Sequence, residues 1–400
     1  MRKLFVPADI LIPREELLPL WSVVACDQYT SEPEYWDRVT EKTAGVPSAR
    51  HLIYPEAYLE TSDAGEVTAK ANAEMEKYLS SGVFRRFSQC YVFVTRTLRS
   101  GTVRHGLMGA VDLSQYDYSA GSKSPIRATE KTVLERIPPR VSLRREAPLE
   151  LPHILMLYED FDCSLLGLLS ERSDEMTVVY DFDLMENSGH ITGRLVSGSL
   201  AEDVSALLDK LTAGSIGIAI GDGNHSLAAA KACFEELCEK IGRPAAMSHP
   251  ARYALAELEN IADEGIVFEP IHRLALCSAG ELLGFIASKN YRFSPVEFFS
   301  GEQNGTLCVC PDGETLPCAG LQSLLDEFAA SHACTIDYIH GDDTARRLGC
   351  ADGAVSFLLP AFPKPALFPT VEREGTLPRK AFSMGHAEDK RFYLEARTIR

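Results

Sequence analysis

The turn GDGNHS, residues 221–226, gathers a carboxylate, an amide, an imidazole and a hydroxyl within six residues. Gly221 and Gly223 permit backbone angles and a close approach that residues with side chains resist. A helix that begins near Asn224 or His225 would present unpaired amide groups and the positive end of its dipole. Because such a helix start binds anions, the turn predicts a phosphate site.

The segments on either side of the turn are typical of a strand and a helix. Residues 216–220 form an apolar run of strand length, and residues 227–241 have the spacing of an amphipathic helix. Two other interpretations stay open. The turn could be a plain connection in which Asp222 or Asn224 caps the helix, or a dinucleotide fingerprint in which Ser226 stands at the third glycine position.

Helix and strand patterns alternate along the rest of the chain, which predicts an α+β (mixed α/β) fold. Helices are expected at 34–42, 65–82, 279–289 and 321–332, with hairpins at 90–113 and 178–196 and strands at 151–160, 253–261, 354–360 and 391–397. Residues 31–34 and 199–202 match capping boxes. Residues 114–152 combine Pro, Ser and Gly with many Lys and Arg, which predicts a long basic loop.

Composition narrows the class of protein. The 400 residues include 40 Lys and Arg against 57 Asp and Glu, a net charge of −17 that disfavours nucleic acid and anionic membranes as partners. No apolar run is long enough to span a bilayer, and Pro7 and Pro13 interrupt the N-terminus before a signal peptide could form. The 11 Cys form no C-x-x-C pair, so we expect reduced thiols, a cytoplasmic location and no structural zinc. The sequence leaves the oligomeric state open.

Five short motifs, in order along the chain, resemble the domain-of-unknown-function family 1015. They are ACDQY, IRATEKT, IGDGNHSLAAA, NIADEGIVFEPIHRL and LPRK. The family hallmark is an Asp-Gly-His-His-Arg turn, which is distantly similar to a turn of the ParB and sulfiredoxin superfamily that includes free-serine kinases. In this chain Asp222, Gly223 and His225 match the hallmark, whereas Asn224 replaces a His and Ser226 replaces the Arg. The turn therefore lacks the arginine guanidinium that would bind a phosphate through two hydrogen bonds.

The resemblance implies a ParB/sulfiredoxin-like unit with large insertions, followed by a C-terminal α+β extension. We expect the first region to span 1–270, with the basic loop and hairpins inserted at about 85–198, and the second to span 271–400. Together with the turn, the resemblance implies a phosphotransferase that moves phosphate from ATP, ADP or pyrophosphate to a small hydroxylated, serine-like metabolite, with Mg²⁺ as cofactor. The alternative is a regulatory protein that binds a nucleotide or phosphometabolite without catalysis.

Each candidate site residue has an expected role. Asp222, His225 and Asp27 are the expected catalytic groups, and Asp222 would also hold the magnesium ion. The expected phosphate-binding residues are Gly221, Gly223, Asn224, Ser226, Arg127, Arg379 and Lys380. The expected substrate-binding residues are Glu130, His272 and Arg273.

Overall fold

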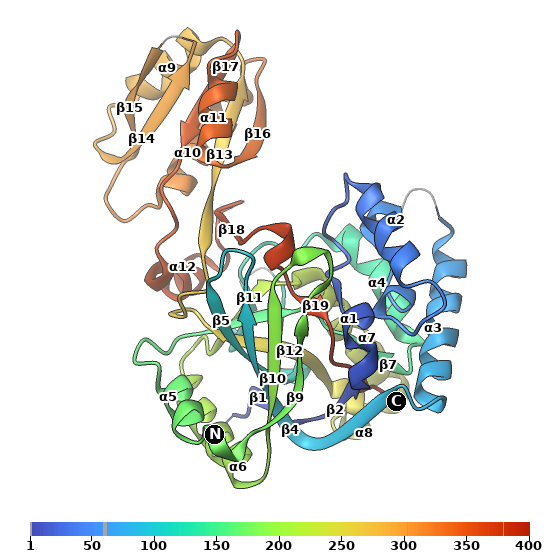
Figure 1. The fold of residues 1–400 in the computed structure, drawn as a ribbon. Helices are drawn as coiled ribbons and strands as arrows, with labels where there is room; N and C mark the ends of the chain where they lie inside the picture. Colours follow the sequence, from blue (N-terminus) through green and yellow to red (C-terminus); the bar gives the residue numbers. More distant parts are fainter. Residues whose placement is uncertain (1, 59–61, 120, 302, 379) are drawn as a thin grey trace. The chain divides into compact units, whose positions relative to one another are not determined.

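The computed structural model describes residues 2–58, 62–119, 121–301, 303–378 and 380–400. The chain divides into two compact units (Figure 1). The first comprises Met1–Ile266 with His386–Arg400, and the second comprises Val267–Gly385. The end of the chain thus belongs to the first unit, which contains the GDGNHS turn.

A long mixed sheet forms the centre of the first unit. Its strands are β1 (Phe5–Val6), β2 (Ala8–Pro13), β4 (Phe84–Thr97), β5 (Val103–Asp112), β6 (Ile126–Ala128), β8 (Leu155–Tyr158), β9 (Thr177–Asp183), β10 (His190–Val196), β11 (Ile218–Asp222) and β12 (Tyr253–Asn260). They lie in the order β6-β11-β8-β12-β5-β4-β10-β9, with β1 paired to β5 and β2 to β4. The predicted hairpins are confirmed as β4–β5 and β9–β10. Because β11 is parallel to β6 and antiparallel to β8, the sheet is mixed. Helices and strands together confirm the predicted α+β fold.

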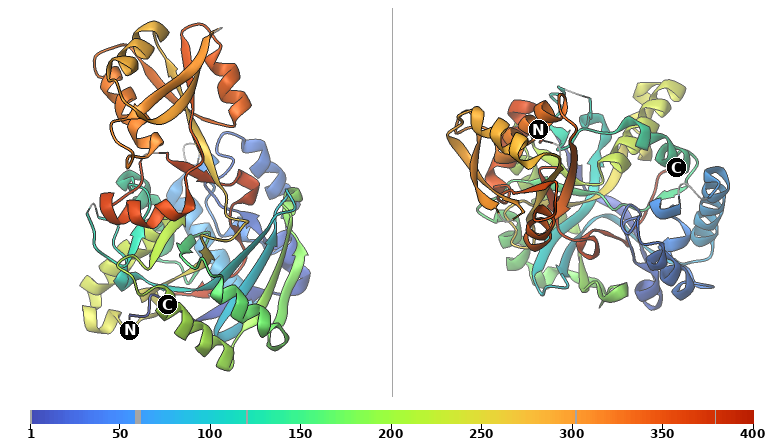
Figure 2. Two further views of the ribbon diagram at one scale, coloured as in Figure 1. Left: turned by 90° about the vertical axis from the view of Figure 1, so that its left-hand side faces the viewer. Right: turned by 90° about the horizontal axis from the view of Figure 1, so that it is seen from above.

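Helices cover both faces of this sheet (Figure 2). They are α1 (Leu18–Trp21), α2 (Pro33–Lys42), α3 (Ala64–Ser80), α4 (Ile137–Arg145), α5 (Ser164–Glu171), α6 (Gly198–Leu211), α7 (Asn224–Ile241) and α8 (Arg243–Ala246). One hydrophobic core joins the sheet to α5, α6 and α7. The other core joins it to α1, α2, α3 and the short pair β3 (Val23–Val24) and β19 (Phe392–Tyr393).

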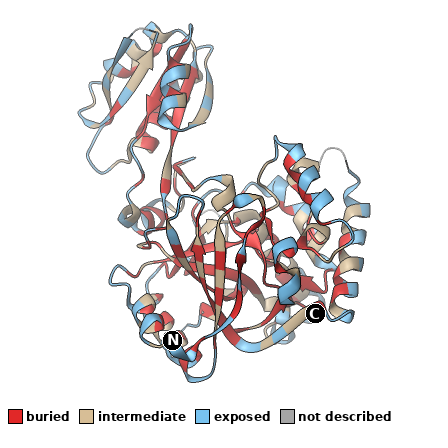
Figure 3. Cartoon of the chain, viewed as in Figure 1, coloured by how far each residue is buried: buried red, intermediate tan, exposed pale blue. Residues whose placement is uncertain are grey.

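The central strands are buried on both faces because their side chains alternate between the two cores. Along β5, Leu107 and Val111 belong to the core with α6, whereas Met108 and Ala110 belong to the core with α1. This is the two-residue period of a strand. Figure 3 shows the result, with mostly buried central strands and helices whose outer faces are exposed.

The predicted basic loop at 114–152 is wrong in its middle. That segment contains β6 and α4, and α4 packs against α7. Pro138 and Pro139 lie in the first turn of α4. Proline is tolerated there because the backbone N–H groups of the first turn have no acceptor within the helix. Ile137 and Val141, one turn apart, bury the same face against α7.

The two predicted capping boxes are also wrong. Helix α2 begins at Pro33 with Glu32 as its N-cap residue, and no side chain accepts a capping hydrogen bond there. Helix α6 has Ser197 as its N-cap residue, again without a side-chain cap. Helix α2 therefore begins one residue after, and helix α6 two residues before, the position that the pattern indicated.

The second unit is an antiparallel sheet with helices. Its strands are β13 (Phe268–Leu276), β14 (Phe293–Ser300), β15 (Gln303–Cys310), β16 (Thr335–His340), β17 (Ala354–Leu358) and β18 (Phe382–Met384), and its helices are α9 (Ala279–Ser288), α10 (Pro317–Ala329), α11 (Asp342–Gly349) and α12 (Leu367–Glu374). The strand order is β15-β14-β17-β13-β16, with β18 paired to β13. The predicted helices at 279–289 and 321–332 are confirmed as α9 and α10.

Two further features bear on the class of protein. All of the cysteines are free thiols. Over the described ranges, none of the helices has both the length and the apolar character needed to cross a lipid bilayer.

Six charged side chains form a cluster inside the first unit, which we call the buried ion-pair cluster. They are Arg96, Arg104, Glu257, Glu259, Arg391 and Glu395. Arg104 Nε lies 2.9 Å from Glu259 Oε1, and Arg391 Nε lies 2.9 Å from Glu257 Oε2. Burial raises the pKa of Glu259 to about 8 even beside the Arg104 guanidinium. The cluster holds the returning C-terminal segment against β4, β5 and β12.

Candidate functional site

The GDGNHS turn lies where β11 ends and α7 begins. Gly223 is the N-cap residue of α7, and its φ of +80° is an angle that glycine adopts without strain. Its amide donates to Asp222 Oδ1 (2.9 Å), and its carbonyl accepts from the Ser226 amide (3.0 Å). The amides of Asn224 and His225 lie in the first turn, where a helix provides no acceptor. The alternative in which Asp222 or Asn224 caps the helix through its side chain is wrong.

Asn224 adds a second unsatisfied group to the turn. Its Oδ1 is buried and has no hydrogen-bond partner among the described residues. A buried acceptor without a donor costs about 1–3 kcal/mol. A ligand that donates a hydrogen bond here would remove this cost.

Lys390 supplies a positive charge beside the turn. Its Nζ lies 3.3 Å from Asp222 Oδ2, and 12% of its side chain is exposed. Its position depends on the buried ion-pair cluster, because Arg96 donates to the Lys390 carbonyl oxygen (2.5 Å) and Arg104 donates to that of Asp389 (3.0 Å). The cation that the turn lacks in sequence is thus provided from the end of the chain.

Asp27 is the second carboxylate near this cation. Gln28 Nε2 donates to Asp27 Oδ1 (3.0 Å). Burial disfavours the charged form of Asp27, but a protonated His153 ring, the hydrogen bond from Gln28 and the Lys390 ammonium together outweigh burial and lower its pKa. Asp27 is therefore ionised at neutral pH, and Lys390 interacts with two carboxylates, Asp27 and Asp222.

His225 is neutral and can donate one hydrogen bond. Its Nε2 accepts the Val133 amide hydrogen (3.2 Å), which places the ring proton on Nδ1. Burial lowers its pKa, and the charges of Arg140 and Arg136 lower it further. A neutral imidazole with a proton on Nδ1 suits an anion bound at the start of α7.

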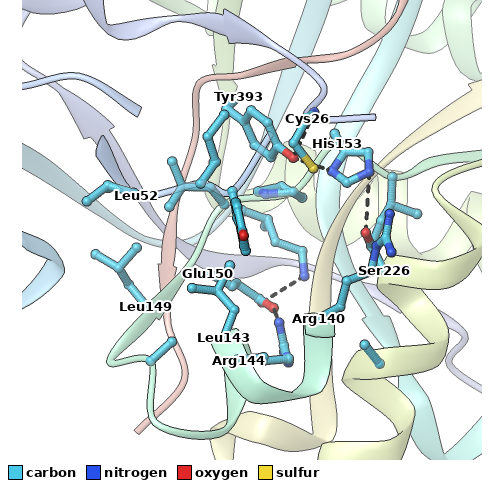
Figure 4. Close-up of a pocket in the computed structure, with 18 of the residues that line it drawn as sticks. Cys26, Leu52, Arg140, Leu143, Arg144, Leu149, Glu150, His153, Ser226 and Tyr393 are labelled. Carbon is cyan, nitrogen blue, oxygen red and sulfur yellow. Dashed lines mark hydrogen bonds and ion pairs between the residues drawn. The ribbon is translucent and has the colours of Figure 1, made fainter. Parts of the chain in front are cut away.

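A chain of hydrogen bonds leads from the turn into the interior of the unit (Figure 4). His153 Nε2 lies 3.3 Å from Ser226 Oγ, and His153 Nδ1 lies 2.8 Å from the Tyr393 hydroxyl oxygen. The same oxygen accepts the Cys26 amide hydrogen (3.3 Å). Burial lowers the pKa of His153 and raises that of Tyr393, so both are neutral. Tyr393 therefore donates to Nδ1, and His153 donates from Nε2 to Ser226.

A cavity of about 130 Å³ adjoins this chain. Ser226, His153, Tyr393 and Cys26 line one part of it (Figure 4). Burial raises the pKa of Cys26 to about 12, so its thiol stays protonated. Elsewhere the wall is mostly apolar, with Leu52, Met75, Leu143, Leu149 and Leu255 among its residues, but it also includes the charged side chains of Glu56, Arg140, Arg144 and Glu150. The cavity thus has a polar end near the turn, apolar walls and a second, charged end.

Arg127 does not point its guanidinium toward the turn. β6 runs parallel to β11, and Arg127 is paired with Ala219. Its Nε donates to the Ser124 carbonyl (2.8 Å), which precedes the strand, whereas Asp222 lies at the opposite end of the strand pair. Its assignment to phosphate stays a prediction with no contact to support it.

The remaining candidates are placed as follows. Glu130 is exposed on the segment after β6. His272 and Arg273 are buried in the second unit, where His272 bonds to Asp342 (3.0 Å) and to the Leu359 amide (3.1 Å). Arg273 donates to Gln322 (2.8 Å), to the Ile271 carbonyl (2.6 Å) and to the Lys380 carbonyl (3.1 Å). Arg379 lies outside the described residues. Substrate and phosphate roles for these residues stay predictions.

Magnesium fits the site only together with a phosphate ligand. In the part of the chain that the structure describes, no group of three or more His, Cys, Asp or Glu side chains could hold a metal ion. Mg²⁺ commonly takes one or two carboxylates and completes its shell with water and substrate phosphate. Asp27 and Asp222 interact with the same Lys390 ammonium and would provide the two carboxylates.

Replacing Gly223 by alanine should destabilise the first unit by about 1–2 kcal/mol, because a side chain disfavours the left-handed angle. The added Cβ would also lie 3.0 Å from the Ile154 Cα. Gly167→Ala is the matched control, since Gly167 lies inside α5 with nothing within 4 Å of an added Cβ and should gain up to about 1 kcal/mol. Urea unfolding measures both changes. Equal stability of the two variants would contradict the strain at Gly223.

Stability should fall between pH 7 and pH 5 in part because of His153. Its folded-state pKa is lowered by burial, so below the ordinary His value the unfolded chain binds a proton that the folded chain does not. One such proton changes the unfolding free energy by about 1.4 kcal/mol per pH unit. His153→Gln should therefore flatten the pH dependence measured by urea unfolding.

His190→Gln provides a control of opposite sign. Hydrogen bonding to Asp183 raises the pKa of His190, so this residue contributes stability at low pH that is lost as the pH rises through its folded-state pKa. His190→Gln should therefore slightly steepen the fall in stability between pH 7 and pH 5, whereas His153→Gln should flatten it. The same slope in both variants would show that His153 is not the group responsible.

Comparisons with known proteins give one broad match and several loose ones. The family model described as protein of unknown function (DUF1015) matches residues 7–317. No curated protein matches the chain. A solved structure of free serine kinase in complex with AMP is 11% identical, with 70% of this chain and 92% of that chain covered and a TM-score of 0.36. A conserved hypothetical protein from Pyrococcus furiosus is 12% identical, with the same coverages and a TM-score of 0.32. SbnI with a C-terminal truncation, from Staphylococcus aureus, is 10% identical, with 62% and 82% covered and a TM-score of 0.28.

Proposed function

The chain belongs to the DUF1015 family of proteins of unknown function, and we propose that this member is a phosphotransferase acting on a small hydroxylated metabolite. One observation carries the proposal: at the start of α7 the Lys390 ammonium lies 3.3 Å from the Asp222 carboxylate and interacts electrostatically with a second carboxylate, that of Asp27. The helix start and the cation favour a phosphate group. The carboxylates suit an acceptor hydroxyl that must lose a proton.

In the proposed reaction, the acceptor hydroxyl oxygen forms a bond to the terminal phosphorus of ATP, ADP or pyrophosphate. The bond from that phosphorus to its leaving oxygen breaks, and the shortened donor departs with the electron pair. The hydroxyl proton passes to Asp27 or Asp222. The amides of Asn224 and His225, the His225 Nδ1–H group and Lys390 stabilise the charge on the transferring phosphate.

Ligand binding tests the proposal first. A ligand that binds only the folded protein raises its melting temperature. We expect ATP, ADP or pyrophosphate, with magnesium, to raise it more than AMP or inorganic phosphate does. The absence of a shift with every one of these compounds would contradict the phosphate site.

Replacing Lys390 by methionine should weaken binding of the same phosphate compound at least about tenfold, because the ammonium is the positive charge closest to Asp222. Isothermal titration calorimetry measures the affinity. Lys70→Met is the control, since Lys70 is 73% exposed on α3 and pairs with Glu66 on the same helix. Equal affinity in the two variants would exclude Lys390 from the site.

A regulatory protein that binds the same ligands without transferring phosphate is the second candidate. The altered turn favours it, because Asn224 and Ser226 replace a His and an Arg of the family hallmark, and Asp222 is already paired with Lys390. Saturable nucleotide binding, without phosphate transfer to any of a panel of alcohols and hydroxylated amino acids, would support this candidate over the enzyme.

A further inference from the structure

The cavity beside Ser226 has the size of a small organic molecule. Its volume is about 130 Å³, and an apolar protein cavity of roughly 150 Å³ can hold benzene. Ile53, Met75, Leu143, Leu149, Ala229 and Leu255 contribute apolar surface to its wall. A ligand that fills this space must therefore carry a compact apolar body.

One end of the cavity is suited to a hydroxyl group. Ser226 belongs both to the cavity wall and to the first turn of α7, and Cys26 in the wall precedes Asp27. The Ser226 oxygen accepts from His153 Nε2, which leaves the serine hydroxyl hydrogen available to a ligand oxygen. A ligand hydroxyl held at this end would lie next to the carboxylates and the phosphate of the proposed reaction.

The other end contains an unsatisfied cationic donor. Arg144 pairs through Nη1 with Glu150, but its Nη2 is buried and has no hydrogen-bond partner in the described ranges. Figure 4 shows Arg144 and Glu150 across the cavity from Cys26, His153 and Tyr393. A buried charged donor without an acceptor is costly, so this end favours a ligand that brings an acceptor.

The charges around this end favour an anionic acceptor. Arg144 and Arg397 both pair with Glu150, and Arg140 pairs with Glu56. Two guanidinium groups thus share the Glu150 carboxylate, which leaves one positive charge in excess at this end, whereas Arg140 interacts with both Glu56 and Asp27. A planar carboxylate is one of the anions that a guanidinium binds well.

We propose that this cavity is the acceptor pocket of the phosphotransferase and that the acceptor is a compact hydroxycarboxylic acid with an apolar body. The inference rests on the proposed function. The ligand carboxylate bonds to Arg144 Nη2, its apolar body fills the leucine-lined space, and its hydroxyl lies at Ser226. An amino acid such as serine fits less well, because the carboxylates in the wall, Glu56 and Glu150, are already paired and its ammonium would gain no partner.

Calorimetric titration of the full-length protein tests the ligand class. The probes are 2-hydroxy-3-methylbutanoate and 3-hydroxybutanoate, with 3-methylbutanoate and serine as comparators and pyrophosphate titrated separately. We expect saturable binding of a hydroxy acid, at least tenfold weaker binding of 3-methylbutanoate, which lacks the hydroxyl, and at least tenfold weaker binding of serine. If pyrophosphate binds and neither hydroxy acid does, this inference fails while the proposed function stands. If none of them binds, both fail.

A pair of variants on α7 tests the location. Ala229→Leu fills the cavity and should abolish binding of the hydroxy acid without changing the affinity for pyrophosphate. Glu239 is exposed near the end of the same helix and outside the cavity wall, so Glu239→Leu should leave both affinities unchanged. If Ala229→Leu does not fold, Leu143→Phe tests the same space from α4. Hydroxy acid binding that survives in a folded cavity-filling variant would overturn the location.

Discussion

Replacing Asp222 by asparagine should lower the rate of phosphate transfer at least about 100-fold while the protein stays folded. Asparagine keeps an Oδ1 that accepts from the Gly223 amide, so the turn retains its shape. The substitution removes the negative charge that pairs with Lys390 and can accept a proton from the acceptor hydroxyl. General base catalysis contributes roughly 10²–10⁴-fold to a rate, so a loss of this size is expected.

Steady-state transfer from ATP, ADP or pyrophosphate measures the effect, and thermal unfolding confirms the fold. Asp162→Asn is the matched control, because Asp162 is exposed before α5 and should leave the rate unchanged. A rate for Asp222→Asn within a few-fold of the original protein would remove Asp222 from the mechanism and leave Asp27 as the proton acceptor. Unchanged binding of the donor would show that the loss lies in the transfer step.

The local part of the site could be predicted from the sequence because local rules determine it. The glycine spacing, the apolar run before it and the amphipathic pattern after it fix β11, the turn and α7 within a short stretch of chain. The detail that failed is the cap. Gly223 takes the N-cap position because the turn needs its positive φ, and the polar residues beside it are left free for other contacts.

The groups that come from elsewhere in the chain could not be predicted. Lys390, His153 and Tyr393 reach the turn only after strand pairing and the return of the C-terminal segment to the first unit. None of them belongs to a motif with a recognisable spacing. The expected cations, Arg127 and Lys380, lie in motifs of the family resemblance. Such a match does not show where the Arg127 guanidinium or the Lys380 ammonium lies in space.

Helix α4 shows how composition can hide an element. The segment is basic and has two prolines, a composition typical of a loop. The positions of these residues could have predicted the helix, because Pro138 and Pro139 lie together at its start and Ile137 and Val141 are one helical turn apart. The helix is stable because that apolar face packs on Ala228 and Ala229 of α7, which is tertiary information.

Replacing Arg391 by methionine should destabilise the first unit by about 3–5 kcal/mol, the usual cost of removing one partner from a buried ion pair. Arg391 is 2% exposed and pairs with both Glu257 and Glu395. The substitution would leave two buried carboxylates, one of which also accepts the Tyr180 hydroxyl hydrogen (2.5 Å). Urea unfolding measures the change in free energy.

Arg243→Met is the matched control for this loss. Arg243 is 56% exposed and pairs with Glu235 at 3.1 Å, so its removal should change stability by less than about 1 kcal/mol. Adding Glu257→Gln to Arg391→Met should recover part of the stability, because one of the unpaired charges is removed with it. Since Arg391 adjoins Lys390 in the chain, the single variant should also bind pyrophosphate more weakly. A loss as small as that of Arg243→Met would mean that water reaches the cluster and that the cluster does not hold Lys390 beside the turn.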